Sequence, residues 1–246
     1  MKRIMITVAY DGTAYHGWQI QPNGVTIEEK LNQALCDLTG EDIRIIGASR
    51  TDAGVHAMGN LAVFDTQSRI VPEKFSAALN ARLPEDIRVF QSVEVAADFH
   101  PRHCDSKKTY EYRIYRGKFE NPIGRQYAHF VYVSLNVENM QKAADYLVGE
   151  HDFKSFCATG AQVLTTVRTI YEARFFTEGD YLIFRISGNG FLFNMVRIIV
   201  GTLLEVGRGN LDPCAMQDIL SACDRQKAGP TAPARGLMLI GYEFFS

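Results

Sequence analysis

Strand-like and helix-like segments follow one another in two successive groups along this chain of 246 residues. In the first group, residues 3–10 alternate between two faces, which predicts a half-buried strand. Thr26 and Glu29 then match a capping box, so we expect a helix to begin there. Its apolar residues continue at helical spacing until Gly40, which is expected to end it.

A second succession begins near residue 107, and no long Gly-, Ser- or Pro-rich linker separates it from the first. Two such groups predict an α+β protein made of two halves around a shared sheet. Short turns such as residues 178–180 favour antiparallel pairing. We place the boundary near residues 101–107, which gives an N-terminal half of residues 1–104 and a C-terminal half of residues 105–246.

The same patterns predict the individual elements. Strands are expected at residues 3–10, 43–46, 60–64, 87–95, 109–115, 128–133, 166–175, 181–187 and 237–244. Helices are expected between residues 26 and 40, over a short stretch at 71–79, and at 137–147, 193–206 and 213–222.

One carboxylate, that of Asp52, lies in a turn-prone loop between two apolar strand-like runs. Gly47 and Gly54 allow the backbone to bend sharply on either side of it. Arg50 precedes Asp52 by two positions, and a nearby cation favours the ionised acid, so we expect a carboxylate at neutral pH. The alternative interpretation is an Asp that only caps a turn and pairs with Arg50.

The charge distribution leaves nucleic-acid binding open. A net charge of −2 argues against it, because nucleic-acid-binding domains usually carry a basic surplus. Basic residues nevertheless gather between residues 102 and 125, interleaved with three tyrosines. Such a mixture suits RNA, because phosphates attract Lys and Arg while bases stack on aromatic faces. The alternative is an edge strand with solvated charges.

Cofactors and export signals are not expected. The chain enters a strand pattern directly, without the flanks of a secretion signal, and its most apolar stretch, residues 191–206, contains polar residues. Five scattered cysteines favour reduced thiols in a cytoplasmic protein. The six histidines lack zinc-ligand spacing, and residues 188–190 lack the other glycines and the lysine of a phosphate loop. We therefore expect no metal and no nucleotide cofactor.

Six blocks of sequence, in order, resemble the TruA family of tRNA pseudouridine synthases. They are residues 10–21 (YDGTAYHGWQIQ), 50–57 (RTDAGVHA), 99–102 with 108–112 (FHPR and KTYEY), 151–156 (HDFKSF), 190–197 (GFLFNMVR) and 231–237 (TAPARGL). Two departures are mild. Lys108 stands where the family often has Arg, and Ile27 with Glu28 stands where Val and Gln are frequent.

The resemblance implies two ferredoxin-like halves flanking a basic cleft, with the Asp52 loop at its floor. It also implies the site residues position by position. Asp52 corresponds to the essential aspartate, Tyr110 to the tyrosine that packs against the target base, and Arg197 to the arginine that pairs with the aspartate. Arg50 corresponds to the residue that helps extrude the nucleotide, and Leu237 to an apolar contact in the base pocket.

Elementary chemistry makes these roles plausible and leaves alternatives open. An enzyme that acts on a stacked uridine must flip it out and compensate the lost stacking. A buried arginine such as Arg197 is costly without a partner, which an anion such as Asp52 would supply. Tyr110 could instead only pack on its strand face.

The implied reaction is the isomerisation of uridine to pseudouridine at positions 38, 39 and 40 of the tRNA anticodon stem-loop, by a homodimer that shares one tRNA. Asp52 could attack the anomeric carbon, add to the uracil ring or remove a sugar proton, and the sequence does not choose among these routes. Two other function classes remain. One is a non-catalytic RNA-binding protein of the same fold. The other is a glycosidase or nucleoside hydrolase, which typically needs a second carboxylic acid that the loop lacks.

Overall fold

The computed structural model describes residues 1–160 and 163–245. These residues form two compact units. Unit 1 consists of residues 1–106 together with residues 238 onward, and unit 2 consists of residues 107–237. The chain thus leaves unit 1 once and returns to it with its last strand.

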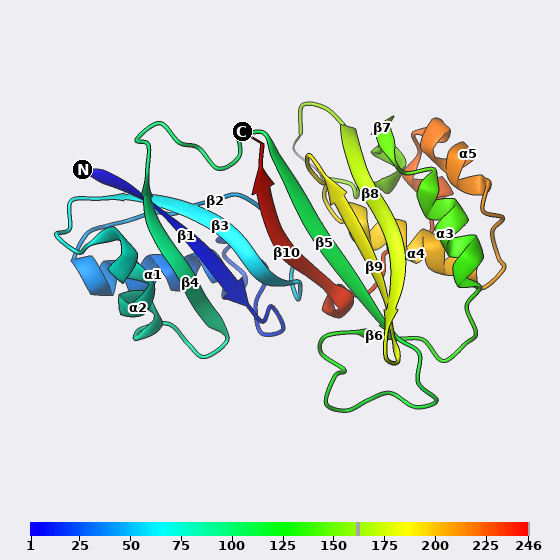
Figure 1. Cartoon of the computed structure of the whole chain (residues 1–246), viewed down its shortest axis with the longest axis horizontal. Helices are drawn as coiled ribbons and strands as arrows, with labels where there is room; N and C mark the ends of the chain where they lie inside the picture. The colour runs from blue at the N-terminus through cyan, green and yellow to red at the C-terminus, as the bar shows by residue number, and fades with distance from the viewer. Residues whose placement is uncertain (161–162, 246) are drawn as a thin grey trace. The chain divides into compact units, whose positions relative to one another are not determined.

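Unit 1 is a sheet with two helices packed on it (Figure 1). Strand β1, Lys2–Tyr10, pairs antiparallel with β3, His56–Thr66, on one side and with β4, Ile87–Val95, on the other. The short β2, Ile46–Gly47, pairs antiparallel with β3, whereas β10, Leu237–Phe244, pairs parallel with it.

The core of unit 1 follows from the patterns in its sequence. Ile4, Ile6, Val8 and Tyr10 of β1 are all buried, as the alternation predicts. Helix α1, Ile27–Thr39, begins at the predicted capping box and ends at Gly40 in the left-handed conformation.

A second, shorter helical stretch packs on the same sheet. It comprises the 3₁₀ turn Pro72–Lys74 and helix α2, Phe75–Asn80. The Phe75 ring meets the Phe64 ring of β3 edge to face at 5.3 Å.

Unit 2 contains antiparallel strands and three helices (Figure 1). Its strands run in the order β5, β9, β8, β7. Their bounds are Ser106–Tyr115 for β5, Tyr181–Gly188 for β9, Val167–Glu178 for β8 and Gly149–Asp152 for β7, and β6, His129–Phe130, lies parallel to β5.

The helices of unit 2 are α3, Val137–Asp145, α4, Met195–Gly207, and α5, Ala215–Ala222. Short 3₁₀ turns at Lys154–Phe156, Arg225–Lys227 and Ala234–Gly236 join the remaining segments. Helix α4 is apolar around most of its circumference and is buried along almost its whole length. The α+β class with mainly antiparallel strands is confirmed.

Two expected strands are shorter than their sequences suggest. In the run 43–46, the Ile45 amide donates to the Asn32 side chain of α1 at 3.0 Å, so this part of the run is held by the helix and only Ile46 and Gly47 pair with β3. In the run 128–133, pairing with β5 stops where β5 itself ends at Tyr115.

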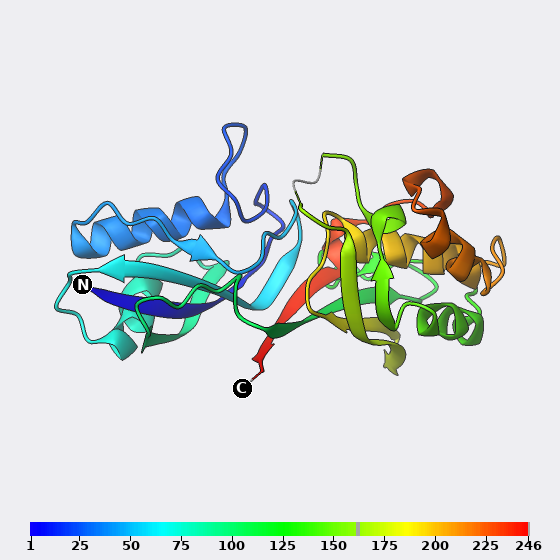
Figure 2. The same cartoon turned by 90° about the horizontal axis from the view of Figure 1, so that it is seen from above.

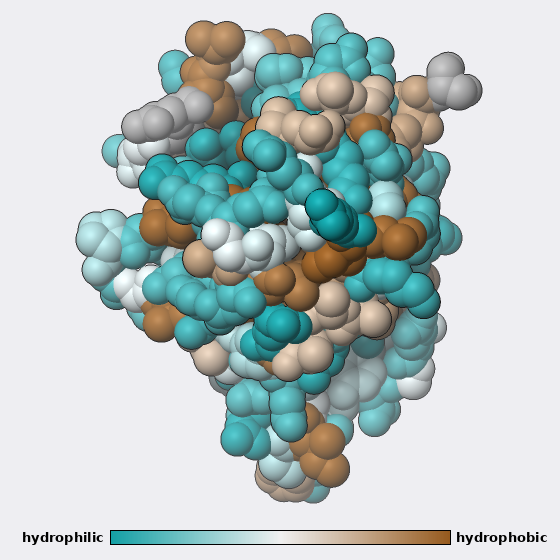
Figure 3. All heavy atoms as spheres, turned by 90° about the vertical axis from the view of Figure 1, so that its left-hand side faces the viewer, coloured by the Kyte–Doolittle hydropathy of each residue, from teal (hydrophilic) through white to brown (hydrophobic). Residues whose placement is uncertain are grey.

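The surface is ordinary for a globular chain. Hydrophilic residues cover most of the face shown in Figure 3, and hydrophobic residues occur there in small groups. Single exposed apolar side chains, such as Val71 and Phe90 of unit 1, are common on protein surfaces. Within the described residues, every helix is too short or too polar to cross a bilayer.

Candidate functional site

The Asp52 loop connects β2 to β3 in unit 1, and we use this name for residues 48–55. The side chain of Asp52 is partly buried, whereas that of Arg50 is exposed. A tight turn closes the loop, because the Val55 amide donates to the Asp52 carbonyl at 3.1 Å. Gly54 in this turn has φ +76°, which a residue with a side chain would adopt only with strain. The backbone at the carboxylate is therefore well defined.

The segment between β1 and α1 holds this loop in place. It projects beyond the sheet of unit 1 before it enters the helix (Figure 2). The Trp18 amide donates to the Thr51 carbonyl at 3.0 Å, and the Gly54 amide donates to the Tyr15 carbonyl at 3.2 Å. Two of the blocks recognised in the sequence, residues 10–21 and 50–57, are thus bound to each other through their backbones.

Two glycines make this close approach possible. Gly17 has φ +86°, and a Cβ atom there would lie 2.6 Å from the Thr51 carbonyl oxygen. A Cβ atom at Gly12 would overlap the Val55 carbonyl oxygen. Both positions therefore need glycine, because any side chain would push the segment away from the Asp52 loop.

His56, the first residue of β3, is a residue whose role the sequence does not predict. Its ring is 2% exposed, and its Nδ1 atom accepts a hydrogen bond from the Gly12 amide at 3.0 Å. The Asp11 Oδ1 atom lies 3.1 Å from the same nitrogen. An unprotonated Nδ1 accepts from Gly12, whereas a protonated Nδ1 donates to Asp11. In both states His56 ties the end of the Asp52 loop to the β1–α1 segment.

A second guanidinium accompanies Arg50 in unit 1. Arg102 donates from Nε to the Gly47 carbonyl at 2.7 Å, just before the Asp52 loop. Burial lowers the pKa of Arg102, and the nearby positive charge of Arg50 lowers it further. Two cations held close together favour an anion such as a phosphate beside them.

The remaining predicted site residues belong to unit 2. Tyr110 lies on β5 and is 7% exposed. The ring of Phe191, from the loop after β9, meets the Tyr110 ring edge to face at 5.1 Å. This contact orients the phenol ring within its own unit.

Arg197 lies in the first turn of α4 and binds a returning segment of chain, residues 228–237. Its Nε atom donates to the Ala232 carbonyl at 2.8 Å, and the Ala232 amide donates back to the Arg197 carbonyl at 3.0 Å. Its Nη1 atom donates to the Asn194 side chain at 2.7 Å. Asn194 caps the helix in the left-handed conformation, with φ 59°. The guanidinium is therefore held rigidly by two neutral oxygen atoms.

The returning segment also rests on β5 and leads directly into Leu237. The Tyr112 hydroxyl donates to the Pro233 carbonyl at 2.8 Å, and burial raises the pKa of this phenol, which keeps it a donor. A Cβ atom at Gly236 would lie 2.7 Å from the Tyr112 ring, so the segment packs flat on it. Leu237 itself is 5% exposed. Arg197 and Leu237 are thus positioned through one segment.

The five predicted residues are accordingly divided between the units. Asp52 and Arg50 lie in unit 1, and Tyr110, Arg197 and Leu237 lie in unit 2.

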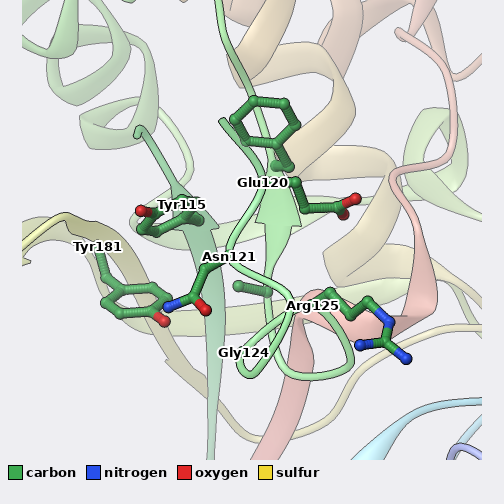
Figure 4. A pocket seen from close by; sticks show the side chains of 8 residues that line it. Tyr115, Glu120, Asn121, Gly124, Arg125 and Tyr181 are labelled. Atoms are coloured by element: carbon green, nitrogen blue, oxygen red, sulfur yellow. The ribbon is translucent and has the colours of Figure 1, made fainter. Parts of the chain in front are cut away.

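A small pocket in unit 2 is separate from these residues. It is lined by Tyr115, Glu120, Asn121, Gly124, Arg125, Ala128, Phe130 and Tyr181 (Figure 4). No predicted site residue lines it. Across the described ranges, no three His, Cys, Asp or Glu side chains gather into a group that could hold a metal ion.

Comparison with known proteins gives a consistent result over the whole chain. The family described as tRNA pseudouridine synthase matches residues 6–103 and 143–244. The chain is 48% identical over 240 residues to "tRNA pseudouridine synthase A" of Thermoanaerobacter sp. (strain X514), and the match covers 98% of each chain. It is 50% identical over 241 residues to the protein of that name from Ruminiclostridium cellulolyticum, again with 98% of each covered. The protein of that name from Brevibacillus brevis is 48% identical over 239 residues.

Proposed function

Because this chain belongs to the tRNA pseudouridine synthase family, we propose that it isomerises uridine to pseudouridine in tRNA, with Asp52 as the catalytic residue. One observation carries the assignment of Asp52. Its loop is fixed by the β1–α1 segment through two backbone hydrogen bonds and two obligatory glycines, so a partly buried carboxylate is held in a defined position. Such preorganisation is what a reacting group needs.

The reaction is an exchange of one bond for another. The bond between N1 of uracil and C1′ of the ribose breaks, the base turns, and C5 of uracil bonds to C1′. The proton on C5 leaves, and N1 gains a proton, so atoms and charge balance without an oxidant or an energy source. Asp52 acts by attack on C1′, by addition to the uracil ring, or by removal of a sugar proton. All three routes need an ionised carboxylate in a site from which water is excluded.

The other predicted residues act on the extruded nucleotide. Arg50, exposed beside Asp52, takes the place of the flipped nucleotide in the stem and compensates part of the lost stacking. Tyr110 presents its ring to the target base, and Leu237 contributes an apolar contact. Arg197 pairs with Asp52 and keeps it ionised.

The finer assignments follow the family resemblance. The substrate positions are 38, 39 and 40 of the anticodon stem-loop, the protein works as a cytoplasmic homodimer that shares one tRNA, and no metal or nucleotide cofactor takes part.

The test uses the purified chain, unmodified tRNA, and a buffer with a chelator and without nucleotides. We expect pseudouridine at positions 38, 39 and 40, and no product from Asp52→Asn, which keeps the shape of the side chain. Both proteins should bind tRNA equally. Conversion by the Asn variant at the rate of the native protein would remove Asp52 from the chemistry. Binding without conversion by the native chain would instead identify a non-catalytic RNA-binding relative.

A further inference from the structure

A buried polar network lies beneath the Asp52 loop, centred on Asn60 of β3. Asn60 is 0% exposed, and its side-chain amide makes four hydrogen bonds. Its Nδ2 atom donates to the Ser49 carbonyl at 3.0 Å and to the Tyr10 hydroxyl at 3.2 Å. Its Oδ1 atom accepts from the Leu61 amide at 2.9 Å and from the Tyr242 hydroxyl at 3.0 Å. This is the full capacity of an amide side chain in donors and acceptors.

Tyr10 carries the network one step further into the loop. Its hydroxyl lies 2.7 Å from Thr51 Oγ1, and both residues are buried. Either hydroxyl can donate in this contact. The network therefore bonds the loop at two residues, Ser49 and Thr51, and Thr51 immediately precedes Asp52.

The residues that these hydrogen bonds reach indicate a role beyond filling the core. An apolar pair of similar shape would fill the same space without the cost of burying polar groups. Two branches of the network end on the loop that presents Asp52, whereas the Tyr242 branch anchors the amide to the last strand, β10. A fully satisfied buried network fixes the orientation of the groups it joins.

We propose that Asn60 and Tyr10 are positioning residues for the catalytic carboxylate. This inference rests on the proposed role of Asp52. The network fixes the position and orientation of the backbone at Thr51. It therefore determines where the Asp52 side chain meets the nucleotide. A displacement of well under an ångström at a reacting group lowers the rate of the chemical step more than it lowers substrate binding. Loss of the network should therefore reduce kcat and leave tRNA affinity almost unchanged.

The chain offers a matched pair of variants for the test. Tyr10→Phe removes the hydroxyl that bonds Thr51 and Asn60. Thr66→Val removes a hydroxyl from a residue of the same unit with similar burial, 1% against 4% exposed, but that hydroxyl bonds Glu41 at 2.9 Å, outside the loop. Both variants lose one buried hydroxyl. They differ in whether the lost bond leads to Asp52.

We expect Tyr10→Phe to lower kcat for tritium release from C5-labelled uridine in tRNA about tenfold, with KM and tRNA Kd within twofold of the native values. Thr66→Val should keep native kcat, and thermal unfolding should show comparable losses of stability in the two variants. Equal kcat values for the two variants, or a loss confined to KM, would overturn the proposal.

A second set of variants tests the route of the effect. Thr51→Val removes the same hydrogen bond from the other side and keeps the branched shape. If the bond acts as one unit, the double variant Tyr10→Phe with Thr51→Val should have the kcat of the worse single variant. Multiplied losses would show that the two residues act independently, contrary to the proposal.

Asp52→Asn is assayed in parallel. If it stays active, the proposed function fails. If it is inactive while Tyr10→Phe is native-like, only the positioning role fails.

Discussion

The Trp18 amide donates a hydrogen bond to the Thr51 carbonyl at 3.0 Å, so the segment before α1 is bonded to the backbone next to Asp52. The contact is backbone to backbone, and it therefore does not depend on which side chains surround it. It depends on how closely the two chains can approach. The glycines on the Trp18 side control that distance.

Gly17 gives the first prediction. A Cβ atom at Gly17 meets the Thr51 carbonyl oxygen at 2.6 Å, and the residue also has a positive φ. Gly40 has a similar φ of +73°, but nothing lies within 4 Å of a Cβ atom there. Gly40→Ala should therefore cost about 1 kcal/mol from backbone strain alone and keep kcat. Gly17→Ala should cost more and lower kcat at least tenfold. Urea unfolding and the tritium-release assay measure the two effects. Native kcat in Gly17→Ala would show that catalysis does not need the close contact between the Trp18 segment and Thr51.

Arg197 gives the second prediction. Its Nε and Nη1 atoms hold Ala232 and Asn194, and a lysine cannot make both bonds. Arg197→Lys should loosen residues 228–237, which hydrogen exchange would detect as faster exchange of the Ala232 amide, and should lower kcat about tenfold. Loss of charged hydrogen bonds of this kind costs roughly 1.5–3 kcal/mol.

The control for this variant is Arg208→Lys. Arg208 caps the same helix, is exposed and pairs with Glu205 at 2.5 Å. The change there should leave both kcat and exchange of the segment unaltered. If Arg197→Lys behaved like this control, the returning segment would not depend on the guanidinium.

Local sequence patterns predict most of the fold. The helix capped by Thr26 is predictable because its cap involves residues three apart, and β1 because its alternation is visible in the chain. The strand at Gly149–Asp152 is not predicted, because its sequence, GEHD, has no apolar alternation and its place is set by pairing with β8. The run at 43–46 is mostly not strand, because Asn32 of a different element takes the Ile45 amide.

The sequence proposes candidate residues for the site, but it does not show which contacts hold them in place. Nothing local to Asn60 indicates that it binds Tyr242, which is 182 positions away. The apolar surroundings of Arg197 in the sequence indicate that it needs partners, and an anion is the natural expectation. Two of its partners are a carbonyl oxygen and an amide oxygen, which no sequence periodicity reveals. Its pairing with Asp52 stays a prediction.

His129 predicts how stability depends on pH. Burial, together with repulsion from Arg235 and Arg208, lowers the pKa of its imidazole to about 4. In the unfolded chain the pKa of this histidine is near 6.5, so between pH 6.5 and 4 the unfolded state binds a proton that the folded state does not. Stability therefore falls as the pH drops from about 6.5 towards 4. The loss attributable to His129 should be roughly 2–3 kcal/mol at pH 4.

Urea unfolding of the native chain and of His129→Gln at several pH values isolates this contribution. The glutamine cannot bind the proton, so the variant should lose less stability than the native protein between pH 6.5 and 4. Parallel curves for the two proteins would mean that His129 accepts its proton in the folded state.

Lys107 and Lys108 on β5 give a prediction about substrate binding. They open the stretch of basic residues and tyrosines, and phosphate contacts release counterions in proportion to their number. Replacing both with Ala should reduce the slope of log K against log salt by about 1–2 for tRNA binding. The control removes two charges elsewhere in unit 2, at Lys142 and Lys154, of which Lys142 is paired with Glu138 at 2.8 Å. A general effect of net charge would change both slopes equally, whereas a docking surface on β5 changes only the first.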